Sequence, residues 1–109
     1  MNVTISELAW EDIRRNVGWW SENRSEAQAA AWYNDIRATI ASLSDLPEQW
    51  PLAREASHFS YVIREYHLRA SGRATHRIVF SVGDNDVVVI RVVHVKQQDI
   101  DPEDHPNPH

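Results

Sequence analysis

Apolar and polar positions alternate along this chain with two different periods, and the change comes near its middle. In the first half, apolar side chains recur every three or four positions, which is typical of helices with one apolar face. These positions are Trp10, Ile13, Val17 and Trp20 in a first group, and Ala29, Trp32, Tyr33, Ile36, Ile40 and Leu43 in a second. The pattern predicts a hairpin of two helices whose apolar faces need a common partner.

Polar and proline residues indicate where these helices begin and end. Ser6 is suited to cap the first helix. Asn23, followed three positions later by Glu26, resembles a capping box and places the start of the second helix there. Pro47 cannot continue a helix, so the second helix is expected to stop near Leu46. Four of the five tryptophans fall in this hairpin, where core packing is their expected role.

In the second half, β-branched and aromatic residues dominate and the pattern is that of strands. Turn residues at Ser71-Gly72 and in the stretch GDND separate three runs, which predict strands at residues 61–69, 73–82 and 87–95. A short β-branched run at residues 2–5 adds a strand at one edge. The expected fold class is α+β, with the helical hairpin packed on one face of a three- or four-stranded antiparallel sheet.

Tight turns would fix the register of the three long strands, and side chains then alternate between two faces. In this register Arg77 lies between Tyr66 and Val92. The face that carries Phe80 and Val89 has the larger apolar side chains and is expected to receive the helices. The opposite face would carry Arg64, Tyr66, Arg77 and His94 together with Val79, Val88, Ile90 and Val92.

The opposite face has no cover from the rest of the chain in this arrangement. Rows of valine beside cationic groups suit a protein partner that brings apolar anchors and acidic residues. The expected partner-binding residues are Val79, Val88, Ile90, Val92 and Tyr66. Alternatively, the charged side chains only border the sheet and bind no partner.

The same register predicts two further pairs across the strands. Arg91 pairs with Glu65 as a partly buried ion pair. His67 pairs with His76, but this pair lacks a third ligand for a metal.

Composition and charge narrow the function classes. The formal net charge of -5 argues against a nucleic-acid partner, although residues 60–98 hold five Arg and one Lys against three acidic residues. Residues 1–98 are expected to form one domain, and the acidic, proline-containing residues 99–109 a disordered tail. The chain has no cysteine and no apolar run long enough to span a bilayer. We therefore expect a cytoplasmic protein without membrane, metal or cofactor.

Four stretches, taken in order, form a pattern that is known from one superfamily. They are SLSDLPEQWP at the end of the hairpin, VIREYHL in the next strand, and HRIVFSV followed by DNDVVVIRVVH. Over residues 1–98 the chain thus resembles the toxins of the RelE/ParE superfamily of type II toxin-antitoxin systems. The resemblance implies a growth-inhibiting toxin that a cognate antitoxin neutralises in a hetero-oligomer. ParE-like members poison DNA gyrase, whereas RelE-like members cut mRNA on the ribosome.

The resemblance also implies roles for individual residues if the chain is a ribonuclease. Arg77 stands where that branch has the arginine that stabilises the scissile phosphate, and Arg64 stands at a second arginine of the pattern. His94 stands at a histidine that is often found near the end of the last strand, although the customary Gly-x-Arg after it is missing. It aligns with the histidine that serves as acid-base group in the ribonucleases only after a shift of one residue. The second proton-transfer group would be Glu55 or Glu65, and the sequence places neither beside the others.

These residues do not make a complete ribonuclease. Cleavage of RNA needs a base, an acid and cationic donors around one phosphate, and Arg77, Arg64 and His94 supply only part of this set. The chain is also net acidic, so it offers few of the basic contacts that binding to ribosomal RNA requires. Both shortfalls favour a ParE-like inhibitor of DNA gyrase that is not an enzyme. The alternatives are a RelE-like ribosome-dependent mRNA endoribonuclease and an inactive toxin-like module that only binds a partner.

Overall fold

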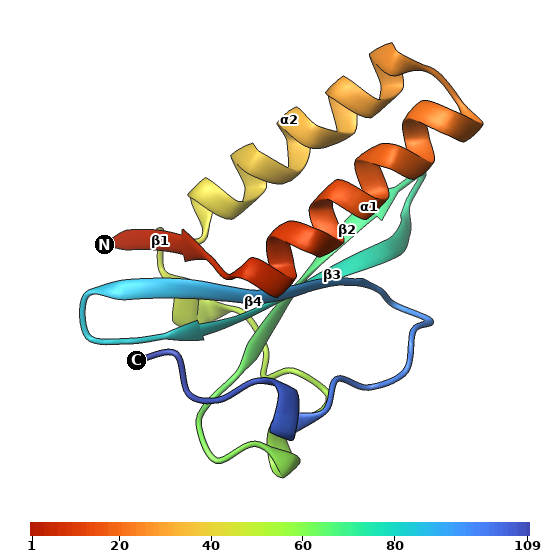
Figure 1. Cartoon of the computed structure of the whole chain (residues 1–109). Coiled ribbons are helices and arrows are strands. Elements are labelled where there is room, and N and C mark those ends of the chain that lie inside the picture. Colours follow the sequence, from red (N-terminus) through yellow and green to blue (C-terminus); the bar gives the residue numbers. More distant parts are fainter.

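A helical hairpin lies across one face of a four-stranded sheet in the computed structural model, which describes residues 1–109 (Figure 1). The helices are α1 (Glu7–Asn23) and α2 (Glu26–Ser42), and the strands are β1 (Asn2–Ile5), β2 (Arg64–Ala70), β3 (Arg73–Val82) and β4 (Asp86–His94). The strand order is β1-β4-β3-β2. The α+β class, the helical hairpin on a single face and the edge position of β1 are confirmed.

The sheet is mixed, which corrects the expectation of a purely antiparallel one. β1 runs parallel to β4, with Ile5 beside Val89, while β2-β3 and β3-β4 are antiparallel hairpins. Ser6 holds the end of β1 in this direction, because its N–H donates to the Val89 carbonyl at 2.9 Å and its Oγ donates to the Ile90 carbonyl at 3.0 Å. Side-chain alternation in a strand carries no information on strand direction.

Both helices begin at a serine cap. Ser6 Oγ accepts a hydrogen bond from the Ala9 N–H at 3.2 Å, as predicted for α1. At α2 the cap is Ser25, whose Oγ accepts from the Gln28 N–H at 3.1 Å. The predicted cap at Asn23 is wrong because α1 continues through this residue, so that Ser25 is the residue left free to cap the second helix.

The end of α2 comes earlier than predicted. The helix stops at Ser42, and the chain then turns into the short 3-10 helix Pro47–Gln49. Leu46, just before it, has a left-handed backbone with φ 49° and is 77% exposed. A residue that precedes proline is disfavoured in the right-handed helical region, and an ordinary side chain strains the left-handed one. The loop therefore holds Leu46 in a conformation that suits glycine better.

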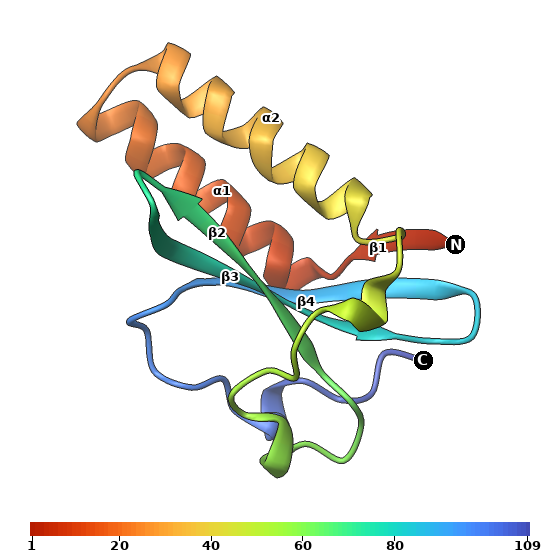
Figure 2. The ribbon, with the colours of Figure 1, turned by 180° about the vertical axis from the view of Figure 1, so that it is seen from behind.

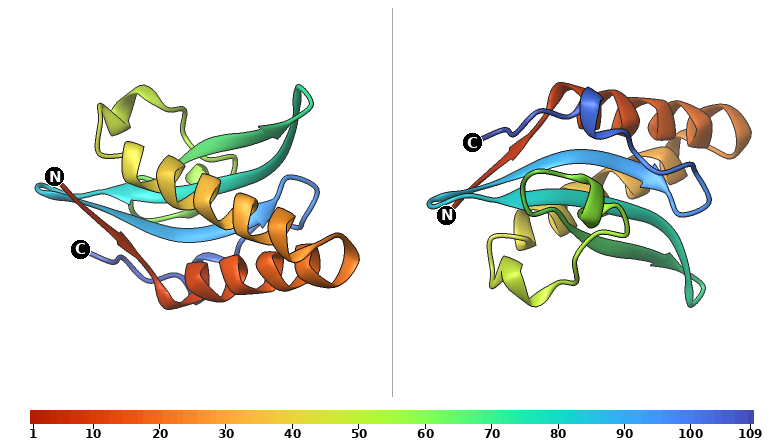
Figure 3. Two further views of the ribbon diagram at one scale, coloured as in Figure 1. Left: turned by 90° about the horizontal axis from the view of Figure 1, so that it is seen from above. Right: turned by 90° about the horizontal axis from the view of Figure 1, so that it is seen from below.

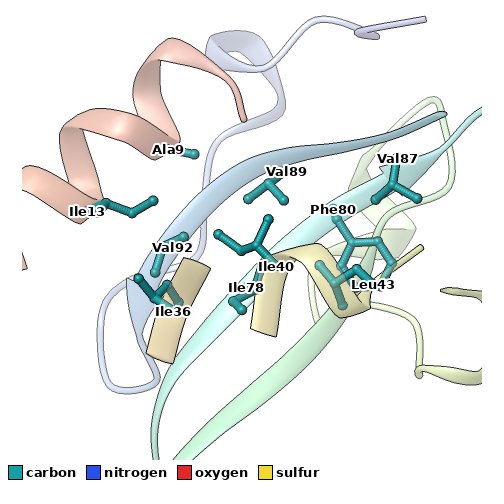
Figure 4. Packing of buried hydrophobic residues seen from close by; sticks show 10 residues of the cluster. All are labelled: Ala9, Ile13, Ile36, Ile40, Leu43, Ile78, Phe80, Val87, Val89 and Val92. Atoms are coloured by element: carbon teal, nitrogen blue, oxygen red, sulfur yellow. The ribbon is translucent and has the colours of Figure 1, made fainter. Parts of the chain in front are cut away.

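The first of two cores lies between the helices and the sheet (Figure 4). It consists of Ala9 and Ile13 from α1, Ile36, Ile40 and Leu43 from α2 and its C-cap, and Ile78, Phe80, Val87, Val89 and Val92 from β3 and β4. The prediction that the face of Phe80 and Val89 receives the helices is confirmed. Val92 belongs to the same core, although it was expected on the opposite face.

A bulge in β4 explains the displaced valine. Ile90 is the extra residue, since the β3-β4 register shifts there. Beyond it Arg77 pairs with Val93 and not with Val92. Because side chains alternate, one extra residue sends every following side chain of that strand to the other face.

A second bulge, in β3, changes the pairing with β2. Thr75 is the extra residue, and beyond it Tyr66 pairs with Ile78 instead of Arg77. Tyr66 and His94 therefore both lie on the helix side of the sheet, whereas Arg77 lies on the opposite side. The predicted grouping of these residues on one face is wrong.

The second core covers the opposite face of the sheet, which was expected to be exposed. It consists of Val79, Val88, Ile90 and Val93 from the sheet, together with Ala53, Ile63 and Ile100. The loop that joins α2 to β2 and the chain after β4 lie side by side over this face (Figure 2). Val79, Val88 and Ile90 are 0%, 7% and 4% exposed, so they are not available to a partner in this conformation.

The C-terminal segment is folded onto the protein rather than disordered (Figure 3). The Arg54 guanidinium donates to the Val95 carbonyl at 2.8 Å and pairs with Asp99 at 2.7 Å. Further along, Tyr61 Oη donates to the His105 carbonyl at 2.8 Å. Acidic and proline-rich composition predicts a frayed tail only when nothing apolar anchors it, and here Ile100 is buried in the second core. Neither α1 nor α2 has the uninterrupted apolar length that a bilayer span requires.

Leu46→Gly tests the strain in the loop after α2. Glycine occupies left-handed backbone without steric conflict, so we expect the substitution to raise the free energy of unfolding by up to about 1 kcal/mol. The matched control is Leu52→Gly, at an exposed leucine whose φ is not positive, and it should lower the free energy of unfolding. Urea denaturation of both variants measures the difference, and a less stable Leu46→Gly would contradict the assignment.

Candidate functional site

Arg77, the arginine expected to stabilise a phosphate, is buried in an ion network on the side of the sheet away from the helices. It is 1% exposed. Arg77 Nη1 donates to Glu55 Oε1 at 2.7 Å and to Glu65 Oε1 at 3.1 Å, and Nη2 donates to Glu55 Oε2. Glu55 and Glu65 are themselves buried. The guanidinium charge is therefore already matched by two carboxylates and has no opening toward a substrate.

Backbone amides complete the coordination of both carboxylates. Glu55 Oε2 accepts from the Ile100 N–H at 2.9 Å, and Glu65 Oε1 accepts from the Arg54 N–H at 2.9 Å. The ring of His67 also hydrogen-bonds Glu65. The network thus joins β2, β3, the loop before β2 and the C-terminal segment, and only Arg77 Nε is left without a hydrogen-bond partner in it.

This setting holds the network in its charged form. Burial raises the pKa of Glu55 and Glu65, but the hydrogen bonds they accept and the charge of Arg77 outweigh it, so both pKa values lie below their ordinary value. Burial lowers the pKa of Arg77, but the two carboxylates outweigh this effect and raise it. Neither glutamate is suited to exchange protons near neutral pH, since that needs a pKa near the working pH.

The other two candidate catalytic residues lie elsewhere. His94 is exposed on the helix side of the sheet, where it pairs with His76 across the strands. Arg64 pairs with Phe80 and donates from Nη1 to the Trp50 carbonyl at 2.8 Å. Arg77, His94 and Arg64 therefore do not share one site, because the two bulges separate residues that a regular register would bring together.

A second ion pair joins α1 to β4. Arg91 Nε and Nη2 donate to Asp12 at 2.7 and 2.9 Å, and Asp12 also accepts from the Val92 N–H at 2.9 Å. An ion pair was predicted for Arg91, but the predicted partner, Glu65, is wrong. Val79 of β3 stands between Arg91 and Glu65 in one row of the sheet, and Glu65 pairs with Arg77 instead. The sequence offers one signal for Asp12, a carboxylate next to an apolar position of the first helix. His67 and His76 also lie on opposite faces and share no ligand position.

A hollow of about 720 Å³ lies between the end of the helical hairpin and the end of the sheet near the β2-β3 turn. We call it the aromatic hollow. Trp19, Trp20, Trp32, Asn16, His76 and His94 line it. The rings of Trp32 and His76 are 5.8 Å apart, and those of His76 and His94 are 5.3 Å apart. The tryptophans were expected to be core residues, yet Trp19 is 49% exposed.

His76 is held neutral in the aromatic hollow. Burial and, second, the neighbouring His94 lower its pKa from 6.5 to about 4, against a smaller opposite effect of Asp12. One ring nitrogen, Nε2, lies 2.9 Å from the side-chain oxygen of Asn16. At neutral pH the floor of the hollow is therefore aromatic and uncharged at His76.

Removing the guanidinium of Arg77 should destabilise the fold. In Arg77→Met, Glu55 and Glu65 remain buried without a cation, so we expect the free energy of unfolding at pH 7 to fall by about 3–5 kcal/mol. Arg69→Met is the matched control, since Arg69 is exposed and pairs with no carboxylate, and should change it by at most about 0.5 kcal/mol. Urea denaturation measures both, and a loss below about 1 kcal/mol at Arg77 would show that the network contributes little.

His76 makes stability depend on pH. Its pKa is lower in the folded protein, so its contribution is fully present above about pH 6.5 and is lost as the pH falls toward 4. Between pH 7 and 4.5 the native protein should lose roughly 2 kcal/mol more than His76→Gln does, allowing for partial exposure. Urea denaturation across this range measures the loss. His58→Gln, at an exposed histidine, is the control and should follow the native profile; parallel profiles for the native protein and His76→Gln would contradict the prediction.

Comparison with known proteins relates this chain to one protein family. The family model for the ParE toxin of the type II toxin-antitoxin system parDE matches residues 3–99. Among solved structures, a chain of the chromosomal ParDE TA system from P. aeruginosa superposes with a TM-score of 0.73 at 16% sequence identity, over 88% of this chain and 97% of that one. This likeness shows the shared fold, and no curated protein matches. Because the family model spans nearly the whole chain, the protein belongs to the family of ParE toxins of type II toxin-antitoxin systems.

Proposed function

We propose that this protein, when free, inhibits bacterial growth by binding DNA gyrase, and that a cognate antitoxin neutralises it in a hetero-oligomer. Membership in the ParE family supports the toxin role and the antitoxin partner. The observation that favours gyrase inhibition over RNA cleavage is the burial of Arg77 in its ion network, across the sheet from His94.

A ribonuclease gathers its charged groups around one phosphate. Here the guanidinium that would stabilise that phosphate is matched by Glu55 and Glu65, and both carboxylates are ionised near neutral pH. The histidine that would transfer protons lies on the other face. A scissile phosphate would have to displace the loop and the C-terminal segment to reach Arg77, which would leave two buried carboxylates without a partner.

A toxin that acts by binding requires surfaces rather than a reactive centre. The second core, expected to form the partner-binding surface, is occupied by the chain itself. Tyr66 packs against Trp50, with ring centroids 4.7 Å apart, and borders the open edge of β2. We therefore expect partner contacts at the hollow beside the end of the helical hairpin and along the edge of β2 beyond Glu65, where the loop before β2 no longer pairs with it.

Two assays with the same protein preparation separate the two activities. In a supercoiling assay with purified gyrase, we expect the toxin to inhibit the enzyme in proportion to its concentration, and an equimolar amount of antitoxin to restore supercoiling. In a translation extract, reporter mRNA should remain intact at the same toxin concentration. Heat-unfolded toxin serves as the control for both assays.

Two other outcomes of these assays would contradict gyrase inhibition. Cleavage of ribosome-bound mRNA at defined positions, abolished by His94→Ala, would overturn gyrase inhibition and establish an endoribonuclease. Absence of both activities, with the complex with antitoxin still formed, would identify an inactive toxin-like binding module.

A further inference from the structure

The aromatic hollow is lined by residues of α1 and α2, by the last residues of β2, by Thr75 and His76 of β3 and by His94 at the end of β4. The α1-α2 turn and the β2-β3 turn lie toward the same end of the molecule (Figure 1). Three of the five tryptophans of the chain line it, and the floor includes two histidine rings. Large aromatic side chains are expected in the core unless they have a role at the surface. Here they gather around one concave site that is open to solvent at Trp19.

Charge is distributed unevenly around this hollow. Five of the eleven Arg and Lys side chains pair with carboxylates, namely Arg14, Arg15, Arg54, Arg77 and Arg91. Of the six that do not pair, Arg24 and Arg69 have their side chains at the hollow, and Arg73 and Lys96 neighbour lining residues through their backbone. The chain as a whole is acidic, so a local excess of unpaired cations marks a surface for an anionic partner.

The positions of these cations follow from contacts with the lining residues. The Arg24 guanidinium lies 5.5 Å from the centroid of the Trp19 ring, and Arg69 lines the hollow directly. The backbone of Arg73 pairs with the lining residue Ala70, and the backbone N–H of Lys96 donates to His94 Nδ1 at 3.1 Å. Arg24 and Arg69 therefore place cations beside the aromatic lining, and Arg73 and Lys96 follow lining residues along the backbone.

We propose that the aromatic hollow is a docking site for an acidic segment of a protein partner, which inserts one bulky apolar side chain between the indoles while its carboxylates meet the cations of the rim. A buried apolar anchor inside a polar rim is the usual arrangement of strong contact residues at protein interfaces. The inference goes beyond gyrase inhibition and does not depend on the outcome of the supercoiling assay.

Nucleic acid is the less suitable partner. Single-stranded nucleic acids also combine stacking with cations, but they need a basic groove that follows the backbone over several nucleotides. The hollow is a single concavity and not a groove of that length. One apolar anchor side chain with acidic neighbours fits this shape better.

Synthetic peptides test the proposal with the full-length protein. The probes are fluorescein-labelled nonapeptides with four acidic residues on either side of a central Leu, Met or Phe. We expect at least one of them to bind, measured by fluorescence anisotropy. Replacing the acidic residues by Lys, or the central residue by Ala, should weaken binding at least about tenfold.

Variants of the toxin locate the site. Trp19→Ala and Arg69→Glu, both at exposed positions, should each weaken binding of the best peptide at least about tenfold. Leu46→Ala and Arg14→Glu are the matched controls at exposed positions outside the hollow and should not change it. On binding, the indole N–H signals of Trp19, Trp20 and Trp32 should shift in NMR spectra, while that of Trp50 should not.

Several results would overturn the proposal. They are absence of peptide binding up to about 1 mM, equal affinity for acidic and basic peptides, or binding that Trp19→Ala leaves unchanged. Tighter binding of a single-stranded oligonucleotide than of any acidic peptide would assign the hollow to nucleic acid. Self-association of the toxin that Trp19→Ala abolishes would assign it to a second copy of the chain.

Discussion

A charged guanidinium in the interior must be neutralised, and this requirement at Arg77 organises one whole side of the protein. Leaving such a charge unpaired would cost several kcal/mol, more than a marginally stable domain can lose without consequence. Its two partners, Glu55 and Glu65, come from the loop before β2 and from β2 itself. Glu65 also accepts a hydrogen bond from the backbone N–H of Arg54, and Glu55 accepts one from the backbone N–H of Ile100. The loop and the C-terminal segment are thus ordered by the same network that neutralises Arg77.

A similar arrangement stands on the helix side. Asp12 is buried at the base of α1 and holds both the guanidinium of Arg91 and the N–H of Val92, at the place where β4 carries its bulge. The sheet is therefore fastened to the helices by one ion pair and to the loop and C-terminal segment by another. This explains why Arg77 and Arg91 occur among the valines of β3 and β4, because each is matched by a carboxylate from another segment of the chain.

These structural roles change the functional interpretation of the strands. Residues that resemble a ribonuclease centre in sequence are used here for stability or lie on different faces, as Arg77 and His94 do. The groups that remain free to meet other molecules lie at the end of the helical hairpin, where Trp19 is half exposed and Arg69 has no carboxylate partner. A toxin of the ParE family that acts through binding is consistent with this distribution of charge and aromatic surface.

The sequence alone determined the two helices, the strands, the face of Phe80 and Val89 that receives the hairpin, and the resemblance to the RelE/ParE toxins. Periodicity is a local property, so it predicts elements and their apolar faces well. Only the tertiary structure decided which residues share a face, because the extra residues Ile90 and Thr75 reverse the alternation and leave no mark in composition. It also decided that Glu55 and Ile100 reach Arg77, since contacts between segments far apart in sequence depend on how whole faces pack and not on any local pattern.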